Sequence, residues 1–303
     1  MFLTVEMVKY NKGGMQMKKY YVLIIDLVKS RSLNEKERFI VQKKLDIAIN
    51  CVNKLMEENI ASLLSFSAGD SVQGLFNTLI SAYDAYHIIK SSVHPYEIRA
   101  GIGYGQINAM MIENIEFIDS NKYDGQAYHK AREAIEVSKK FHDNLVIKVN
   151  DKFDEMINPI IEDSNIVSMT SLRMTIYSLI NMIDPLIDKR HHLSSDYFDM
   201  ITPLILEMVN YYRENSRVAY DNKSINEKLN IEQVSLLLIE YYFAYKNNQD
   251  NSIISTATRT LLVALTGSRE QNVNSMIKIS KMDDLRSRIV SKRKILKYLY
   301  EEV

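Results

Sequence analysis

The chain has 303 residues, enough for two domains, and its 46% apolar and 25% charged residues are typical of a protein with a buried core. Lys plus Arg number 38, as do Asp plus Glu, so the overall charge does not mark a nucleic-acid-binding protein. The single cysteine, Cys51, excludes an intramolecular disulfide and fits a reducing cytoplasm, and no Cys/His spacing typical of zinc is present. No apolar run reaches the length of a membrane span, so we expect a cytoplasmic protein without a membrane partner.

The first 17 residues lack the long apolar core and the small-residue cleavage site of a secretory signal. Met15 or Met17 could be the true start of translation. We therefore expect residues 1–17 to be a disordered leader or the product of a mis-assigned start.

The stretch from about residue 18 to 150 predicts a mixed sheet. An apolar run over residues 20–25 predicts a strand that ends at Asp26, and Asn34 with Glu37 forms a capping box that begins a helix. Further strands are expected at 60–67, 71–76, 96–108 and 144–149, and further helices at 78–92 and 125–141. The order βαββαβ, followed by shorter elements, predicts an α+β, ferredoxin-like sheet with its helices on one face.

From about residue 151 the sequence predicts an all-helical domain that extends to residue 303. Helices are expected at 168–187, 195–213, 231–246, 252–266, 268–280 and 283–300, and the last three are linked like a helix-turn-helix unit. Residues 268–297 include nine basic residues and three acidic ones. This excess suits phosphate contacts with DNA, while a solvated helical surface is the alternative. The expected nucleic-acid-binding residues are Arg286, Arg288, Lys292 and Arg293.

Two carboxylates are the candidate metal ligands. Asp26 ends the first strand, and Asp70 lies in the turn between the strands at 60–67 and 71–76. If the first strand lies beside this hairpin, the two carboxylates can face each other and hold Mg²⁺. The alternative is that backbone amides satisfy each carboxylate locally.

Six of the nine glycines lie between residues 69 and 125, so close backbone approach is needed in this region. Gly101 and Gly105 fall within a strand, where they let a neighbouring backbone or a ligand come close. Arg99 of the same strand either contacts a phosphate or faces solvent. Arg132 stands early in a helix, where the helix dipole opposes a cation, so a bound anion would explain it. The alternative is that Arg132 is an exposed charge without a ligand.

Four motifs together resemble the SatD family. They are YYVLIIDLVKS, SFSAGDSVQG, IRAGIGYGQI and YDGQAYHKAREAI. SatD proteins in turn resemble the nucleotidyl cyclase fold, shared by class III cyclases and GGDEF domains, with a helical part that follows. The resemblance covers residues 18–150 well and the rest loosely, and it implies a cyclase-like domain followed by a helical domain over 151–303.

The resemblance also implies roles for single residues. In cyclases the acids that match Asp26 and Asp70 bind two metal ions. The cyclase strand pattern R-x-G-x-x-x-G matches Arg99, Gly101 and Gly105. The expected ligand-binding residues are Arg99, Gly69, Gly101, Gly105, Gly125 and Arg132.

The sequence departs from the cyclase pattern at the positions that select the base and stabilise the transition state. His129 stands where a cyclase has Asn, and Glu133 stands at the place of the transition-state Arg. Ser65 and Ser67 lie near the place of the purine-selecting Lys. The resemblance therefore favours binding of a phosphorylated nucleotide with Mg²⁺ over cyclisation.

We expect a regulator that binds such a nucleotide at its first domain and contacts DNA or a protein through its helical part. An active cyclase or nucleotidyltransferase, which makes a cyclic or oligomeric nucleotide at the same site, is the alternative. A scaffold with a degenerate pocket is the third reading. The sequence leaves a homodimer open.

Overall fold

The structure is a computed structural model that describes residues 18–67, 71–107, 124–141, 144–161, 169–187, 193–216, 228–247 and 252–301. Its five-stranded sheet has the order β2-β3-β1-β4-β5. Neighbouring strands pair antiparallel except β4 and β5, which are parallel. The α+β class and all five predicted strands are confirmed: β1 (Lys19–Leu27), β2 (Ile60–Phe66), β3 (Val72–Phe76), β4 (Ile98–Gln106) and β5 (Leu145–Lys148).

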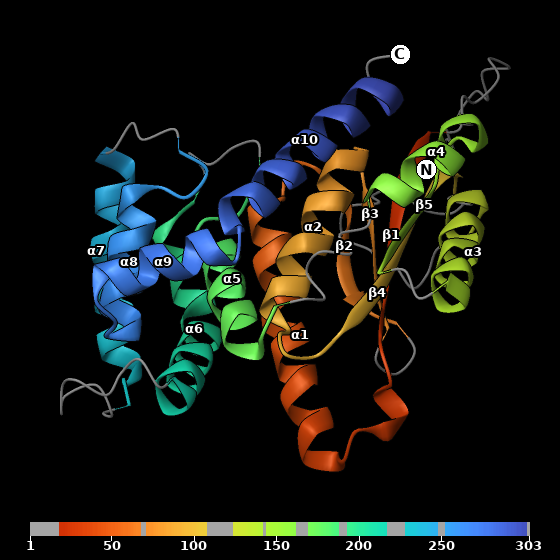
Figure 1. Cartoon of the computed structure of the whole chain (residues 1–303). Coiled ribbons are helices and arrows are strands. Elements are labelled where there is room, and N and C mark those ends of the chain that lie inside the picture. The colour runs from red at the N-terminus through yellow and green to blue at the C-terminus, as the bar shows by residue number, and fades with distance from the viewer. Residues whose placement is uncertain are drawn as a thin grey trace, which may run out of the picture.

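Helices α1 (Glu35–Leu55) and α2 (Leu79–Ser92) cover one face of this sheet (Figure 1). The predicted capping box is confirmed, because the Asn34 side chain accepts from the Glu37 amide at 2.9 Å and the Glu37 carboxylate accepts from the Asn34 amide at 3.0 Å. Every second residue of β1 faces these two helices. Both helices therefore form as the sequence predicts, and they bury the first hydrophobic core.

Helix α3 (Gln126–Phe141) covers the opposite face of the sheet (Figure 1). The alternate residues of β1, Tyr20, Val22 and Ile24, pack there against α3. The expectation that the helices share one face is therefore wrong. A sheet buried on both faces explains why β1 is a nearly continuous apolar run.

The glycines of β4 allow α3 to lie directly on the strand. A Cβ at Gly101 would come within 2.4 Å of the Ala131 carbonyl oxygen, and one at Gly103 within 2.3 Å of the Ala127 carbonyl oxygen. At Gly105 a Cβ would meet the Gln126 side chain at 2.6 Å. The expectation that Gly101 and Gly105 admit a ligand is corrected, because α3 fills the space above both.

Every regular element that the structure describes after β5 is a helix. The predicted helices of this half correspond to α5 through α10, and α5 to α9 supply most of a second hydrophobic core. Helix α4 was not expected, since it lies at the predicted domain boundary and contains Pro159. The helices are α4 (Asp151–Ile161), α5 (Ser171–Ile183), α6 (Ser195–Asn215), α7 (Ile231–Asn247), α8 (Thr256–Thr266), α9 (Glu270–Ile279) and α10 (Met282–Tyr300).

Helix α10 returns to the sheet and runs alongside α2 (Figure 1). Ile289 and Leu296 of α10 belong to the first core, and the Glu301 carboxylate accepts a hydrogen bond from the Ile80 amide at 3.1 Å. Helix α1 in turn contributes Cys51 to the second core. The two cores thus share helices, and the domain boundary near residue 150 stays a prediction. No helix in the described part of the chain combines the length and the hydropathy needed to cross a bilayer.

Candidate functional site

A polar cavity of about 420 Å³ lies where β1 ends, between the β2–β3 hairpin and α3. Pairing of Ile25 with Val72 brings the base of the hairpin beside the end of β1. The Ser67 amide donates to the Ser71 carbonyl at 2.8 Å and closes the hairpin. The lining residues are Ile24, Asp26, Ser67, Ser71, Gln73, Arg132, Ile135, Glu136 and Lys139.

The predicted ligands Gly69 and Asp70 lie outside the described residues. Their neighbours Ser67 and Ser71 both line the cavity. The residues on either side of 68–70 therefore lie at the cavity that holds Asp26. How the two carboxylates face each other stays a prediction.

Asp26 points to the α3 side of the sheet, because it continues the alternation of Tyr20, Val22 and Ile24. Its side chain is 28% exposed, and its Oδ2 lies 3.5 Å from Nζ of Lys139. The same ammonium lies 2.7 Å from Oε1 of Glu136. A single cation thus stands between two carboxylates at the mouth of the cavity.

The hydrogen bond to Glu136 is the largest cause that raises the pKa of Lys139; burial opposes this shift and the charge of Asp26 adds to it. The ammonium therefore stays charged at neutral pH. The position of this ammonium shows that the carboxylates of Asp26 and Glu136 can hold one positive charge between them.

Arg132 lies one helical turn before Glu136 and two turns before Lys139, so the three residues share one side of α3. Its guanidinium lies 3.3 Å from a carboxylate oxygen of Asp124 and is half exposed. The cavity therefore combines two cations, suited to phosphate oxygens, with two carboxylates, suited to a hard metal ion.

Mg²⁺ commonly takes one or two carboxylates and fills its other positions with water and substrate phosphates. Asp26 and Glu136 supply two carboxylates, and the hydroxyls of Ser67 and Ser71 and the amide of Gln73 add oxygen donors. Within the described ranges no group of three or more His, Cys, Asp or Glu side chains is arranged for a metal ion. The residues present thus fit a magnesium ion that arrives with its phosphates better than one held by protein alone.

The structure brings Asp26 and Arg132 into one cavity but leaves the other placed ligand candidates outside it. Arg99 pairs with Asp26 across β1 and β4 yet does not line the cavity. Gly125, with φ 138°, precedes α3 and lines a separate open hollow. Glu136 and Lys139 were not predicted, although their spacing of four and seven residues from Arg132 was a signal on the helix.

The predicted nucleic-acid-binding residues are corrected by their burial. Arg286 is completely buried and bonds to Asp184, and Lys292 donates to the carbonyl of Ile161 at 2.9 Å. Arg293 is 9% exposed and pairs with Asp84, with Nε 2.7 Å from Oδ1. Only Arg288 of the four is exposed. The three buried cations join α10 to the body of the protein, so of the four predicted residues only Arg288 is available to a DNA phosphate.

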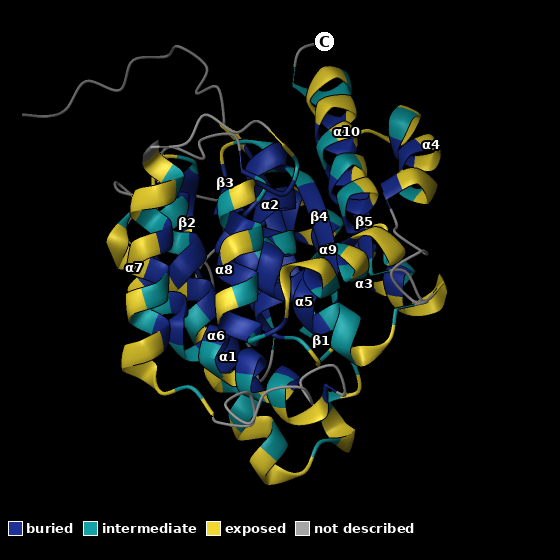
Figure 2. Ribbon diagram, turned by 60° about the vertical axis from the view of Figure 1, so that its left-hand side comes forward, coloured by how far each residue is buried: buried dark blue, intermediate teal, exposed yellow. Residues whose placement is uncertain are grey.

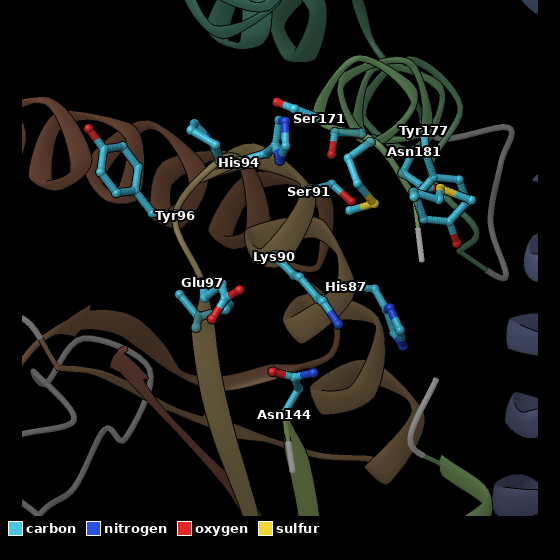
Figure 3. Close-up of a pocket in the computed structure, with 15 residues that line it drawn as sticks. His87, Lys90, Ser91, His94, Tyr96, Glu97, Asn144, Ser171, Tyr177 and Asn181 are labelled. Atoms are coloured by element: carbon cyan, nitrogen blue, oxygen red, sulfur yellow. The ribbon is translucent and has the colours of Figure 1, made fainter. Parts of the chain in front are cut away.

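A second cavity, of about 340 Å³, lies between α2, the start of β4 and α5 (Figure 3). Sequence reasoning gave no sign of it, because its lining comes from segments that are far apart in the chain.

The fold and the site together define a class of protein. It is an α+β protein with a polar, mixed-charge cavity at the end of its central strand. The SatD family model matches residues 20–239, more than two thirds of the chain. The chain therefore belongs to the SatD family, as its motifs predict. A search of curated proteins finds no match.

Proposed function

We propose that this SatD-family chain binds a phosphorylated nucleotide together with Mg²⁺ in the cavity at the end of β1, and that it acts as a cytoplasmic regulator rather than as a cyclase. The observation that carries the proposal is the position of the Lys139 ammonium, between the carboxylates of Asp26 and Glu136. An ammonium between two carboxylates marks a place where a divalent ion can bind.

In this proposal Asp26 and Glu136 hold Mg²⁺, and Lys139 turns from the carboxylates toward the phosphates. Arg132, on the same side of α3, reaches a second phosphate oxygen. Asp70, which the family resemblance matches to a metal ligand, would complete the metal site. Bound Mg²⁺ would neutralise phosphate charge and align the chain of phosphates.

A thermal-shift titration tests the proposal. Nucleoside triphosphates with Mg²⁺ should raise the melting temperature of the wild type, and Asp26→Asn should abolish the rise, as should Asp70→Asn. Asp46→Asn, an exposed carboxylate of α1, is the matched control and should keep it. No rise with any triphosphate would contradict the proposal and favour a scaffold. Pyrophosphate release from a bound triphosphate would instead favour the enzyme.

A further inference from the structure

The cavity between α2, the start of β4 and α5 has a lining with one positive and one negative charge. Lys90 of α2 and Glu97, just before β4, are the charged residues among its described lining. Neither has an ion-pair partner within the described part of the chain, and Figure 3 shows Glu97 just before β4 and Lys90 extending from α2 toward the side of Asn144 and His87. An ammonium and a carboxylate that line one cavity without pairing with each other can both bind a ligand that carries both charges.

The histidines of this lining add hydrogen-bonding groups but no charge. Burial lowers the pKa of His94 to about 4, and burial together with the nearby cations lowers the pKa of His87 well below its usual range. His87 packs edge-on against Tyr83 and Tyr86, and its buried Nε2 has no hydrogen-bond partner in the described structure. A buried nitrogen without a partner costs free energy unless a ligand or water satisfies it.

The rest of the lining suits a small organic molecule. Ser91, Ser171 and Ser178 supply hydroxyls, and Met174 and Tyr177 supply apolar surface. A cavity of about 340 Å³ lies at the lower end of the size range of small-molecule sites. Its walls come from both hydrophobic cores, since α2 belongs to the first and α5 to the second.

We propose that this cavity binds a free α-amino acid, whose carboxylate pairs with Lys90 and whose ammonium pairs with Glu97. Bound there, the ligand would connect α2 and β4 to α5 and so stabilise the contact between the two cores. The site is independent of the cavity at Asp26.

The test is a thermal-shift screen of the wild type against the standard L-amino acids, followed by isothermal titration of the best one. We expect one or a few of them to bind, and the matching amine without a carboxylate and the matching acid without an amine to bind at least about tenfold more weakly. Lys90→Met and Glu97→Gln should each weaken binding about tenfold, while Lys54→Met, an exposed lysine of α1, should not. Absence of any stabilisation, or equal binding of the amine or the acid, would overturn the proposal.

A second, independent inference concerns the outer side of α7. Leu236, Ile239 and Phe243 are 61%, 40% and 59% exposed, and their spacing of three and four residues places them in one stripe. Figure 2 shows exposed residues along this helix, at the edge of the molecule. Such spacing is that of the a and d positions of a paired helix.

Charges at the two ends of the stripe are arranged symmetrically about its centre. Glu232 precedes Ile239 by seven residues and Lys246 follows it by seven. Both are exposed, and neither forms an ion pair within the described ranges. If a second copy of α7 lay antiparallel with its Ile239 against this one, Glu232 of each copy would face Lys246 of the other, a self-complementary arrangement.

We infer that a second copy of this chain pairs with the first along α7. Sedimentation equilibrium should show a dimer in the micromolar range, weakened about tenfold by Glu232→Lys or by Lys246→Glu. The double variant Glu232→Lys/Lys246→Glu restores both pairs and should dimerise within about threefold of the wild type. A monomeric wild type, or a double variant as weak as the single ones, would contradict the inference.

Discussion

Arg286 of α10 and Asp184, directly after α5, form an ion pair in which both side chains are completely buried, with Nη2 3.1 Å from Oδ2. The guanidinium also donates to Asn181 at 2.8 Å and to the carbonyls of Ile253 and Asp184 at 3.1 and 2.8 Å. Burial of an ion pair is tolerated best when further hydrogen bonds satisfy its polar atoms, and here Nε, Nη1 and Nη2 of Arg286 all donate hydrogen bonds. One residue thus joins α10, α5 and the segment before α8.

Removal of either partner should destabilise the protein strongly. Arg286→Met leaves the Asp184 carboxylate uncompensated, and we expect the free energy of unfolding to fall by about 3 to 5 kcal/mol in urea titrations. Arg288→Met, an exposed neighbour on the same helix, should change it by less than about 0.5 kcal/mol. Equal, small effects of the two substitutions would show that the pair does not hold α10 in place.

The buried cations of α10 show what the sequence could and could not predict. Met282, Leu285, Ile289 and Leu296 form a helical stripe, and Arg286, Lys292 and Arg293 fall within it. That periodicity was a signal that the cations face inward. Charge alone predicted a solvent-facing surface, because a single sequence does not reveal which carboxylates lie opposite, here Asp184 and Asp84, 102 and 209 residues away.

The central sheet was more predictable than the site. Local signals, such as the Asn34 capping box and the turn between β2 and β3, determine where elements begin and end. They do not tell which face of the sheet a helix covers, so the face that α3 covers was predicted wrongly and its contribution of Glu136 and Lys139 to the cavity was missed. The glycines of β4 predicted close approach correctly, but the sequence could not distinguish a helix from a ligand.

The contact of α3 with β4 can be tested at Gly103. An alanine there would place its Cβ 2.3 Å from the Ala127 carbonyl oxygen and from the Ala131 amide nitrogen, so backbone must shift. We expect Gly103→Ala to lower the free energy of unfolding by about 3 kcal/mol. At Gly74 a Cβ meets mainly the Leu64 side chain, and Gly74→Ala should cost less. Chemical denaturation of both variants provides the comparison, and the reverse order would contradict the packing.

Stability should fall in mild acid because of His94. Burial and the charge of Lys44 lower its pKa from 6.5 to about 4, so below pH 6.5 the unfolded chain takes up a proton that the folded chain does not. The loss should begin near pH 6.5, amount to about 2 to 3 kcal/mol, and be complete near pH 4. Urea titrations from pH 7.5 to 4.5 should show a shallower loss in His94→Gln. An unchanged pH dependence in this variant would exclude His94 as its source.

Lys139 should have opposite effects on metal and on nucleotide. In Lys139→Met the carboxylates of Asp26 and Glu136 lose their cation, so Mg²⁺ alone should bind about fivefold more tightly. A triphosphate should bind about fivefold more weakly, because one phosphate contact is lost. Isothermal titration measures both. The same direction of change for the two ligands would contradict the proposed movement of Lys139.

The central claim is that Asp26 holds a divalent ion together with a nucleotide. Electron paramagnetic resonance with Mn²⁺ in place of Mg²⁺ tests it most directly, since the signal of free Mn²⁺ decreases when the ion binds. In the presence of a triphosphate, added wild-type protein should lower the signal of free ion, and Asp26→Asn should not. An equal decrease with both proteins, or none with either, would contradict the account.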